Sequence, residues 1–258
     1  MNDMPWDDIA ADWDRKMGGE GDFFQRHLTI PAIESLIGSI EDKRVLDAGC
    51  GNGFLARHFA TQGATVTGVD TSEALIEQAR DYDDTVEYQV ADIKDMSLGE
   101  TYDVILCNNV IQHIEDYQRV LDTFDDHLAD DGRIIITVRH PCFKPIQEDA
   151  GWRLEGTEKI EHTGTGLSEL DLPESEPRSF KITKYFEPET AEREFEGERI
   201  PIINRTLSDH AEALREQGFC ITGLREPVPG EDGRQERPDL CRLLETIPHF
   251  LIFEISRH

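Results

Sequence analysis

Three glycines at alternate positions, Gly49, Gly51 and Gly53, are the residues whose type and spacing most plainly serve chemistry. They follow an apolar segment that predicts a buried strand at 44–46, and the segment 54–63 after them predicts a helix closed by a glycine. Glycine adopts positive φ and has no Cβ to keep a ligand away from the backbone. Since a helix start also offers unpaired N–H groups, the spacing predicts a place where a carboxylate or phosphate lies against bare backbone.

Polar side chains stand at the ends of the next three predicted strands. Asp70 ends the segment 64–70, whereas Asp92 and Asn108 follow the segments 85–90 and 102–107. Open α/β sheets bind ligands at the carboxyl ends of their strands, and an acid at the tip of the second strand accepts hydrogen bonds from ribose hydroxyls. The dinucleotide-binding fingerprint is Gly-x-Gly-x-x-Gly. This chain has Gly-x-Gly-x-Gly instead and no obvious Tyr-x-x-x-Lys, which disfavours a nicotinamide dehydrogenase.

The order of these pieces resembles a class I S-adenosylmethionine-dependent methyltransferase over roughly residues 40–140. The later segments 139–143, 204–209 and 218–227 are similar to a branch of small-molecule methyltransferases, in which a His often precedes the Arg-x-Leu-Ser element. Asn204 stands at that place here. The resemblance implies S-adenosylmethionine as cofactor, and methyl transfer by in-line displacement to an O, N or C atom of a small molecule.

The resemblance also assigns residues to the cofactor. They are Trp13, Asp47, Gly49, Gly51, Gly53, Asp70, Thr71, Asp92, Ile93 and Asn108. Asp47 and the glycine loop would hold the amino acid end, Asp70 the ribose, and Asp92 the adenine amino group. Turn residues and loop caps are the ordinary alternative for the acids and the amide. A core tryptophan is the alternative for Trp13.

Methyl transfer needs a base only where the acceptor O or N arrives protonated. The protein otherwise aligns the reactants and excludes water. His113 and His140, after the fourth and fifth predicted strands, are the candidate catalytic residues, with Tyr185 a weaker one. A structural role is the alternative for each histidine. The Asn/Asp-Pro-Pro-Tyr/Phe motif of enzymes that methylate planar amide or adenine nitrogens is absent, which argues against those acceptors.

The pattern of elements predicts an α/β, Rossmann-like fold. The family resemblance makes it a seven-stranded, mostly parallel sheet with an antiparallel last strand and helices on both faces. Residues 1–40 predict a helical cap, 41–143 with 205–258 the core, and 144–204 an insert that covers the substrate. A disordered acidic loop is the alternative for the insert.

Finer predictions concern the insert and the C-terminal part of the chain. Segments 179–186 and 192–200 are expected to form a strand pair, and 227–247 a Pro-flanked connection. Arg26 is either a partner of the cofactor carboxylate or a surface arginine.

The composition is strongly acidic, with 54 Asp and Glu against 26 Lys and Arg and a net charge of −28. Such a charge argues against nucleic acid or an anionic membrane as partner. Because the charge is diffuse, it favours a solvated surface suited to a high-salt cytoplasm over recognition of a basic substrate. The 5 cysteines have no metal or redox spacing, so we expect a reduced, cytoplasmic protein without a metal site. The expected oligomeric state is a monomer or a homodimer.

Two other functions remain open. A protein or RNA methyltransferase is disfavoured by the acidic surface and by the lack of an appended binding domain. A non-catalytic S-adenosylmethionine-binding module would keep the glycine loop and Asp70 but lack an enclosed acceptor pocket.

Overall fold

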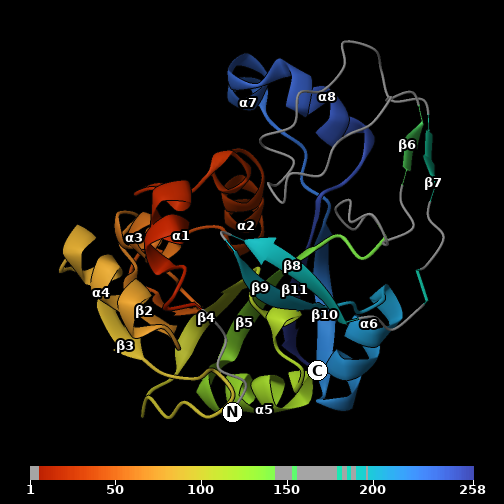
Figure 1. The fold of residues 1–258 in the computed structure, drawn as a ribbon. Helices are drawn as coiled ribbons and strands as arrows, with labels where there is room; N and C mark the ends of the chain where they lie inside the picture. The colour runs from red at the N-terminus through yellow and green to blue at the C-terminus, as the bar shows by residue number, and fades with distance from the viewer. Residues whose placement is uncertain (1–5, 143–152, 156–178, 182–184, 187–189, 196) are drawn as a thin grey trace.

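The computed structural model describes residues 6–142, 153–155, 179–181, 185–186, 190–195 and 197–258. Its centre is a seven-stranded sheet in the order β10-β11-β5-β4-β1-β2-β3 (Figure 1). The strands are β1 (Arg44–Ala48), β2 (Thr65–Asp70), β3 (Glu87–Val90), β4 (Tyr102–Asn108), β5 (Leu128–Arg139), β10 (Phe219–Arg225) and β11 (Phe250–Arg257). The last strand, β11, is antiparallel to both neighbours, and the other pairs are parallel. The predicted fold class is therefore confirmed.

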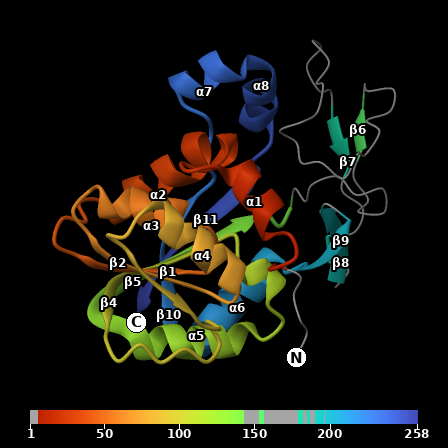
Figure 2. The same ribbon diagram turned by 60° about the vertical axis from the view of Figure 1, so that its left-hand side comes forward.

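Helices cover both faces of this sheet because its central strands are apolar on both sides. In β4, Val104 and Leu106 pack in one apolar cluster, whereas Ile105 and Cys107 pack in the other. The helices on the first face are α2 (Ile30–Ile37), α3 (Phe54–Ala60) and α4 (Glu73–Tyr82), and those on the second are α5 (Tyr117–His127) and α6 (Leu207–Glu216) (Figure 2). Alternate strand residues point to opposite faces, which gives the chain two cores.

The predicted N-terminal cap is helical within the described residues. It contains α1 (Ala10–Met17), the π-helical turn η1 (Gln25–Thr29) and α2, and it continues into the first face of the sheet. Met17 of α1 packs in the same apolar cluster as α2 and α3.

The Pro-flanked connection predicted at 227–247 contains helices that were not predicted from the sequence. Two helices lie there, α7 (Glu231–Glu236) and α8 (Pro238–Thr246), drawn at the top of Figure 1. Pro238 stands at the first position of α8, where its missing N–H leaves no bond unmade. Leu240 and Leu244 of α8 lie in one buried apolar cluster with Phe24, the residue before η1.

The predicted pairing of segment 179–186 with segment 192–200 is wrong. In the structure β8 (Thr190–Phe195) pairs with β9 (Glu198–Ile203), and β6 (Arg153–Glu155) pairs with β7 (Ser179–Lys181). Gly197 has a φ of +88° in the tight connection between β8 and β9, so the nearest segment in sequence becomes the partner. Residues 144–152, 156–178, 182–184, 187–189 and 196 of the predicted insert lie outside the described part of the chain.

Candidate active site

The glycine loop between β1 and α3 has the geometry that its spacing predicts. Gly49, Gly51 and Gly53 have φ values of +81°, +55° and +76°. A Cβ at Gly49 would lie 2.4 Å from Val110, and one at Gly53 would lie 2.3 Å from the Tyr88 hydroxyl oxygen. At Gly51 the nearest atom would be Nε1 of Trp13, at 3.5 Å. The protein's own packing therefore excludes a side chain at the outer two glycines, while Gly51 faces a space bounded by a tryptophan.

Asp70, at the tip of β2, holds this loop in place. Its two carboxylate oxygens accept the N–H groups of Gly51 and Ser72, each at 2.9 Å. Burial raises the pKa of Asp70, and these backbone hydrogen bonds act in the opposite direction. Ser72 in turn caps α4, as expected of a hydroxyl at that position, by accepting the N–H of Leu75. One carboxylate thus joins the glycine loop to the start of α4.

Asp47, at the end of β1, is 1% exposed, and its Oδ2 atom has no hydrogen-bond partner within the described residues. Burial, assisted by the charge of Asp70, raises the pKa of Asp47 to about 7. A buried carboxyl with an unused oxygen beside bare backbone fits an ammonium donor. The residues predicted for the amino acid end of the cofactor therefore suit that group chemically.

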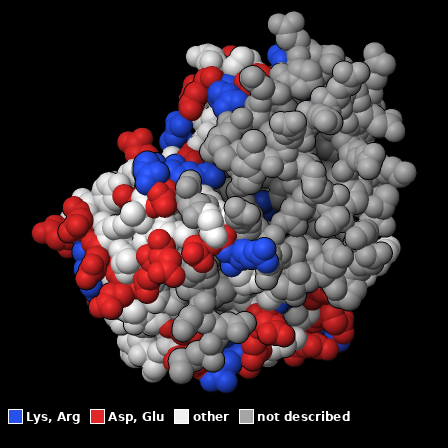
Figure 3. Space-filling model, in the orientation of Figure 1, with Lys and Arg blue, Asp and Glu red and all other residues white. Residues whose placement is uncertain are grey.

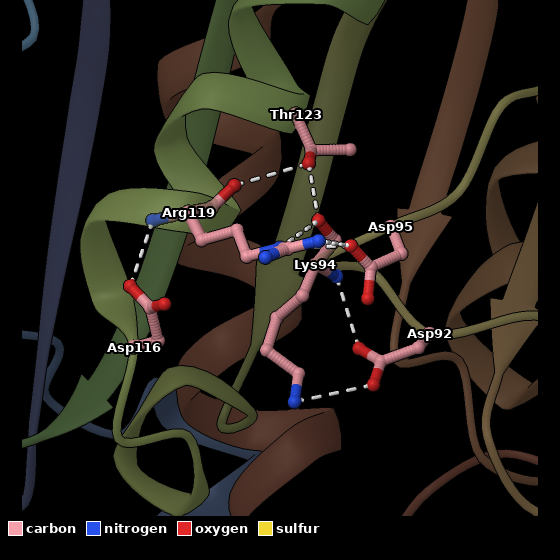
Figure 4. A network of polar contacts seen from close by, with 6 residues as sticks. All are labelled: Asp92, Lys94, Asp95, Asp116, Arg119 and Thr123. Carbon is pink, nitrogen blue, oxygen red and sulfur yellow. Dashed lines mark hydrogen bonds and ion pairs between the residues drawn. The ribbon is translucent and has the colours of Figure 1, made fainter.

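Asp92, after β3, lies in a polar network that Figure 4 shows from close by. Its Oδ1 accepts the N–H of Lys94 at 2.9 Å, and its Oδ2 is 3.3 Å from Nζ of the same lysine. Asp95 pairs with Arg119, and the Thr123 hydroxyl donates to the Lys94 carbonyl at 2.8 Å. The network joins the connection after β3 to α5. Asp92 therefore makes the backbone contact expected of a turn residue, and it also lies near the end of a strand, as a ligand-binding residue would.

Asn108 ends β4 and donates through Nδ2 to Oε1 of Gln25 at 3.0 Å. Gln25 is buried in η1, whose π-helical turn is a geometry frequent at functional sites. Gln25 was not predicted as a site residue, because no local sequence pattern indicates a π-helical turn. The next residue, Asn109, has a φ of +61°, which is rare outside glycine and is concentrated at active sites.

Two assigned cofactor residues offer little side chain to a ligand. Ile93 is 3% exposed and packs in the core beside α5. Thr71 is exposed at the turn before α4. Their backbone, at the carboxyl edge of the sheet, is the part that a bound molecule could reach.

Trp13 belongs to an aromatic cluster above the glycine loop. Its ring centroid is 5.7 Å from that of Trp6 and 5.8 Å from that of Phe195, and Trp6 lies 5.3 Å from His113. All three contacts are edge-to-face, a favourable arrangement for aromatic rings. The cluster joins α1, the hairpin β8–β9 and the end of β4 over one region of the molecule.

His113 lies in the short 3₁₀ helix η2 (Ile111–His113), directly after β4. Its Nδ1 atom is 2.8 Å from the carbonyl oxygen of Pro201 in β9. Because a carbonyl only accepts, Nδ1 carries the proton in the neutral ring, and Nε2 is the acceptor nitrogen. The Nε2 atom of Gln112 lies 3.4 Å from it.

His140, after β5, has a different environment. It is 3% exposed, its Nε2 lies 2.7 Å from Oε1 of Glu226, and its Nδ1 accepts the N–H of Cys142 at 3.2 Å. Burial lowers the pKa of His140, and Glu226 acts against this. Both ring nitrogens are engaged, with the proton on Nε2, so the contacts favour the structural role for this histidine.

The weaker candidates are held elsewhere. The Tyr185 hydroxyl accepts the N–H of Leu207 at the start of α6, at 3.0 Å. Arg26 forms a two-pronged pair with Glu236 of α7, at 2.8 and 3.0 Å, and His27 lies 2.7 Å from the same carboxylate. Through these contacts Arg26 joins η1 to α7.

Within the described ranges, no cluster of three or more His, Cys, Asp or Glu side chains could hold a metal ion. No helix in the same ranges is long and apolar enough to cross a membrane. The cytoplasmic location and the high-salt interpretation of the surface stay predictions.

The chain is similar to known proteins in sequence and in fold. Residues 24–164 match the family described as a methyltransferase domain. A ubiquinone biosynthesis O-methyltransferase of Coxiella burnetii (strain Dugway 5J108-111) is 32% identical over 146 residues. The match covers 53% of this chain and 61% of that relative, so it spans about three fifths of the relative's length.

Two solved structures share the architecture. An S-adenosylmethionine-dependent methyltransferase from Mesorhizobium loti is 23% identical with a TM-score of 0.71, over 93% of this chain and 100% of that chain. DhpI, in a complex with SAM and HEP, is 19% identical with a TM-score of 0.60, over 97% and 94% of the two chains. Likeness at these identities concerns the fold, in which both agree with the sheet described above.

Proposed function

Because the chain belongs to the methyltransferase-domain family, we propose that it transfers a methyl group from S-adenosylmethionine to a hydroxyl oxygen of a small molecule, with His113 as general base. Family membership confirms the predicted resemblance to class I S-adenosylmethionine-dependent methyltransferases, and S-adenosylmethionine as the cofactor. The choice of oxygen as acceptor atom is supported by the O-methyltransferase relatives and by the state of His113.

The observation that carries the proposal is the hydrogen bond from His113 Nδ1 to the Pro201 carbonyl. It puts the lone pair on Nε2 and fixes the ring plane. The lone pair would then accept a hydroxyl proton in place of the Gln112 amide N–H, which lies 3.4 Å away. The base follows β4, and the glycine loop follows the neighbouring strand β1. The carboxyl ends of both strands therefore bring base and cofactor to one edge of the sheet.

The cofactor supplies an electrophilic methyl group when bound. On the protein side, Asp47 would hold the ammonium, the open face of Gly51 would receive the amino acid end, and Asp70 would accept the ribose hydroxyls. Asp70 can do so while holding two backbone N–H groups, because a carboxylate has about four lone-pair sites. Trp13 would cover the cofactor from the other side of Gly51.

We also propose that the segment around Trp6 and the hairpin β8–β9 form a cover over the reactants. Trp6 contacts His113, and Asp7 accepts the Ser72 hydroxyl at 2.6 Å, so the N-terminal segment links the ends of β4 and β2. Phe195 contacts Trp13 from the hairpin. Such a cover excludes water during transfer. Limited proteolysis tests it, since equal cleavage of these segments with and without S-adenosylhomocysteine would argue against a cover.

The negative charge of the protein bears on which class of acceptor it can bind. On the face in Figure 3, acidic side chains lie in several groups over the described surface, with fewer basic ones between them. A net charge of −28 repels RNA and other polyanions. These features support a small-molecule acceptor over a nucleic acid.

A transfer assay tests the proposed base. Labelled methyl from S-adenosylmethionine is followed into catechol and into extracted small metabolites, with the wild type and His113→Gln. Loss of the base should lower transfer by about 10²- to 10⁴-fold while calorimetry shows unchanged cofactor affinity. Full transfer by His113→Gln would contradict the role of the base. Cofactor binding without transfer to any small molecule by the wild type would favour the binding-module alternative.

A further inference from the structure

Resting on the proposed function, we propose that Arg205 is a positioning residue that holds the loop carrying His113. The side chain reaches from the segment between β9 and α6 to the carbonyl oxygens around η2. Its role is to keep the base in one place and one tautomer, and it does not touch the reactants.

The contacts of Arg205 concentrate on the main chain around the base. Its Nη1 donates to the Ile111 carbonyl at 3.0 Å, and its Nη2 donates to the carbonyls of Ile114 and Glu115 at 2.6 and 2.9 Å. Ile111 and Ile114 lie on either side of His113 in sequence. The carbonyls of Ile111 and Glu115 also accept backbone N–H groups, at 3.3 and 3.0 Å, which leaves each a second lone pair for the arginine. One planar guanidinium supplies several donors at fixed angles.

The surroundings of the Arg205 guanidinium support a structural role for these hydrogen bonds. Its Cζ atom lies 5.1 Å from the ring centroid of Tyr117, a cation–π distance. Burial lowers the pKa of Arg205, which is the electrostatic cost of placing a cation there. In a chain with 54 acidic residues, its described hydrogen bonds go to carbonyl oxygens rather than to carboxylates.

Arg205 and Pro201 act on the same base from one short segment. Pro201 accepts from the imidazole Nδ1, while Arg205 binds the carbonyls of the helix that carries the ring. Directly after Arg205, Thr206 and Asp209 form a capping box that fixes the start of α6. The segment 201–209 is therefore anchored to α6 on one side and to His113 on the other.

A matched control exists in the same chain. Arg257, on β11, donates to the carbonyls of Asp125, Leu128 and Ala129, where α5 passes into β5, at 2.5, 3.1 and 3.1 Å. Unlike Arg205, it also pairs with a carboxylate, Oδ1 of Asp125, at 2.6 Å. It performs the same kind of carbonyl capping on the part of β11 that pairs with the start of β10. Loss of either arginine should cost stability by a similar mechanism, so a difference between the two variants reports on position relative to the base.

The experiment compares Arg205→Gln, Arg205→Lys and Arg257→Gln with the wild type. Side-chain ¹⁵N NMR of the full chain reads the tautomer of His113, whose signal is assigned by its loss in His113→Gln. We expect a single Nδ1–H tautomer in the wild type and in Arg257→Gln, and a mixture of tautomers in Arg205→Gln. Arg205→Lys should recover only part of the effect, since lysine keeps the charge without the planar fork.

Transfer of labelled methyl to catechol supplies the second measurement. Arg205→Gln should lose about 10- to 100-fold in kcat with unchanged cofactor affinity, the scale of a misplaced group. Should Arg205→Gln fail to fold, Arg205→Lys gives the same comparison. An unchanged tautomer in a folded Arg205 variant would overturn the proposal. A mixed tautomer without loss of transfer would keep Arg205 as the positioning residue and refute His113 as base, which separates the two proposals.

Discussion

The cofactor side and the acceptor side of the site are held together by different kinds of contact. On the cofactor side Asp70 binds the N–H of Gly51, only 19 residues away in sequence. On the acceptor side His113 binds the carbonyl of Pro201, 88 residues away, and Arg205 binds a carbonyl 94 residues away. The first set forms within one strand–helix–strand unit, whereas the second requires the C-terminal third of the chain to be docked.

The contrast has a chemical meaning. The cofactor side is built from carboxylates on backbone N–H groups, which suits a ligand that presents the same ammonium and hydroxyl groups in every turnover. The acceptor side depends on a segment that enters from far along the chain. Changes in that segment can therefore alter the acceptor or the base without disturbing the cofactor, and the two sides should respond to separate perturbations.

The largest expected effect comes from removing the carboxylate that organises the cofactor side. Asp70→Ala should weaken S-adenosylmethionine binding by about 1.5–3 kcal/mol, the scale for losing charge-assisted hydrogen bonds. Calorimetry measures this. The control is Asp103→Ala, since Asp103 also accepts a backbone N–H, from Arg44 at 2.9 Å, at the amino end of β1. Equal affinity loss in both variants would mean that general destabilisation, and not a ribose contact, explains the result.

The next largest effect is a loss of stability on the acceptor side at acidic pH. His210 of α6 is 4% exposed, lies against Tyr117 and Phe253, and has no hydrogen-bond partner described for Nδ1. Burial, with the charge of Arg205, lowers its pKa from 6.5 to about 4. A folded-state pKa below the unfolded value means that the unfolded chain binds the proton first. The contribution of His210 is therefore complete above pH 6.5 and is lost as the pH falls towards 4.

Between pH 7 and pH 5 this single group should cost about 2 kcal/mol of unfolding free energy. His210→Leu removes the titration and leaves no unpaired nitrogen, so its loss over the same interval should be smaller than that of the wild type by that amount. Urea unfolding at the two pH values measures the difference. Parallel losses in wild type and variant would show that His210 does not make the acceptor side acid-sensitive.

The local part of this architecture was predictable from the sequence. Positive φ at Gly51 and the acid at the tip of β2 follow from residue type and spacing, because a glycine turn and a strand end are short-range features. Gln25 and Arg205 were not identified as site residues. Gln25 acts through a π-helical turn, and Arg205 through a loop distant in sequence, and neither leaves a periodic pattern.

The helices that were not predicted and the strand pairing that was predicted wrongly have the same kind of cause. The helices α7 and α8 are short, and Leu240 and Leu244 become recognisable as a packed face only when they meet Phe24. The pairing of β8 was decided by the tight turn at Gly197 and not by strand composition. Both depend on contacts rather than on local preference, which sequence patterns report poorly.

The smallest effect tests whether the open face of Gly51 is a binding surface or only a turn. Gly51→Ala and Gly218→Ala both put an L-residue at positive φ, +55° and +77°. A Cβ at Gly218 meets nothing within 4 Å, and one at Gly51 meets only Trp13 at an ordinary contact distance. Each variant should lose about 1 kcal/mol of unfolding free energy, the cost of an L-residue in the left-handed region.

Only Gly51→Ala should weaken S-adenosylmethionine binding, because its methyl group would occupy the space beside Trp13 that the amino acid end needs. Urea unfolding and calorimetry on both variants separate the two quantities. Equal stability losses with unequal affinities would place the cofactor against Gly51. Unchanged affinity in a folded Gly51→Ala would remove this glycine from the binding surface and leave it the same role as Gly218, a residue that only turns the chain.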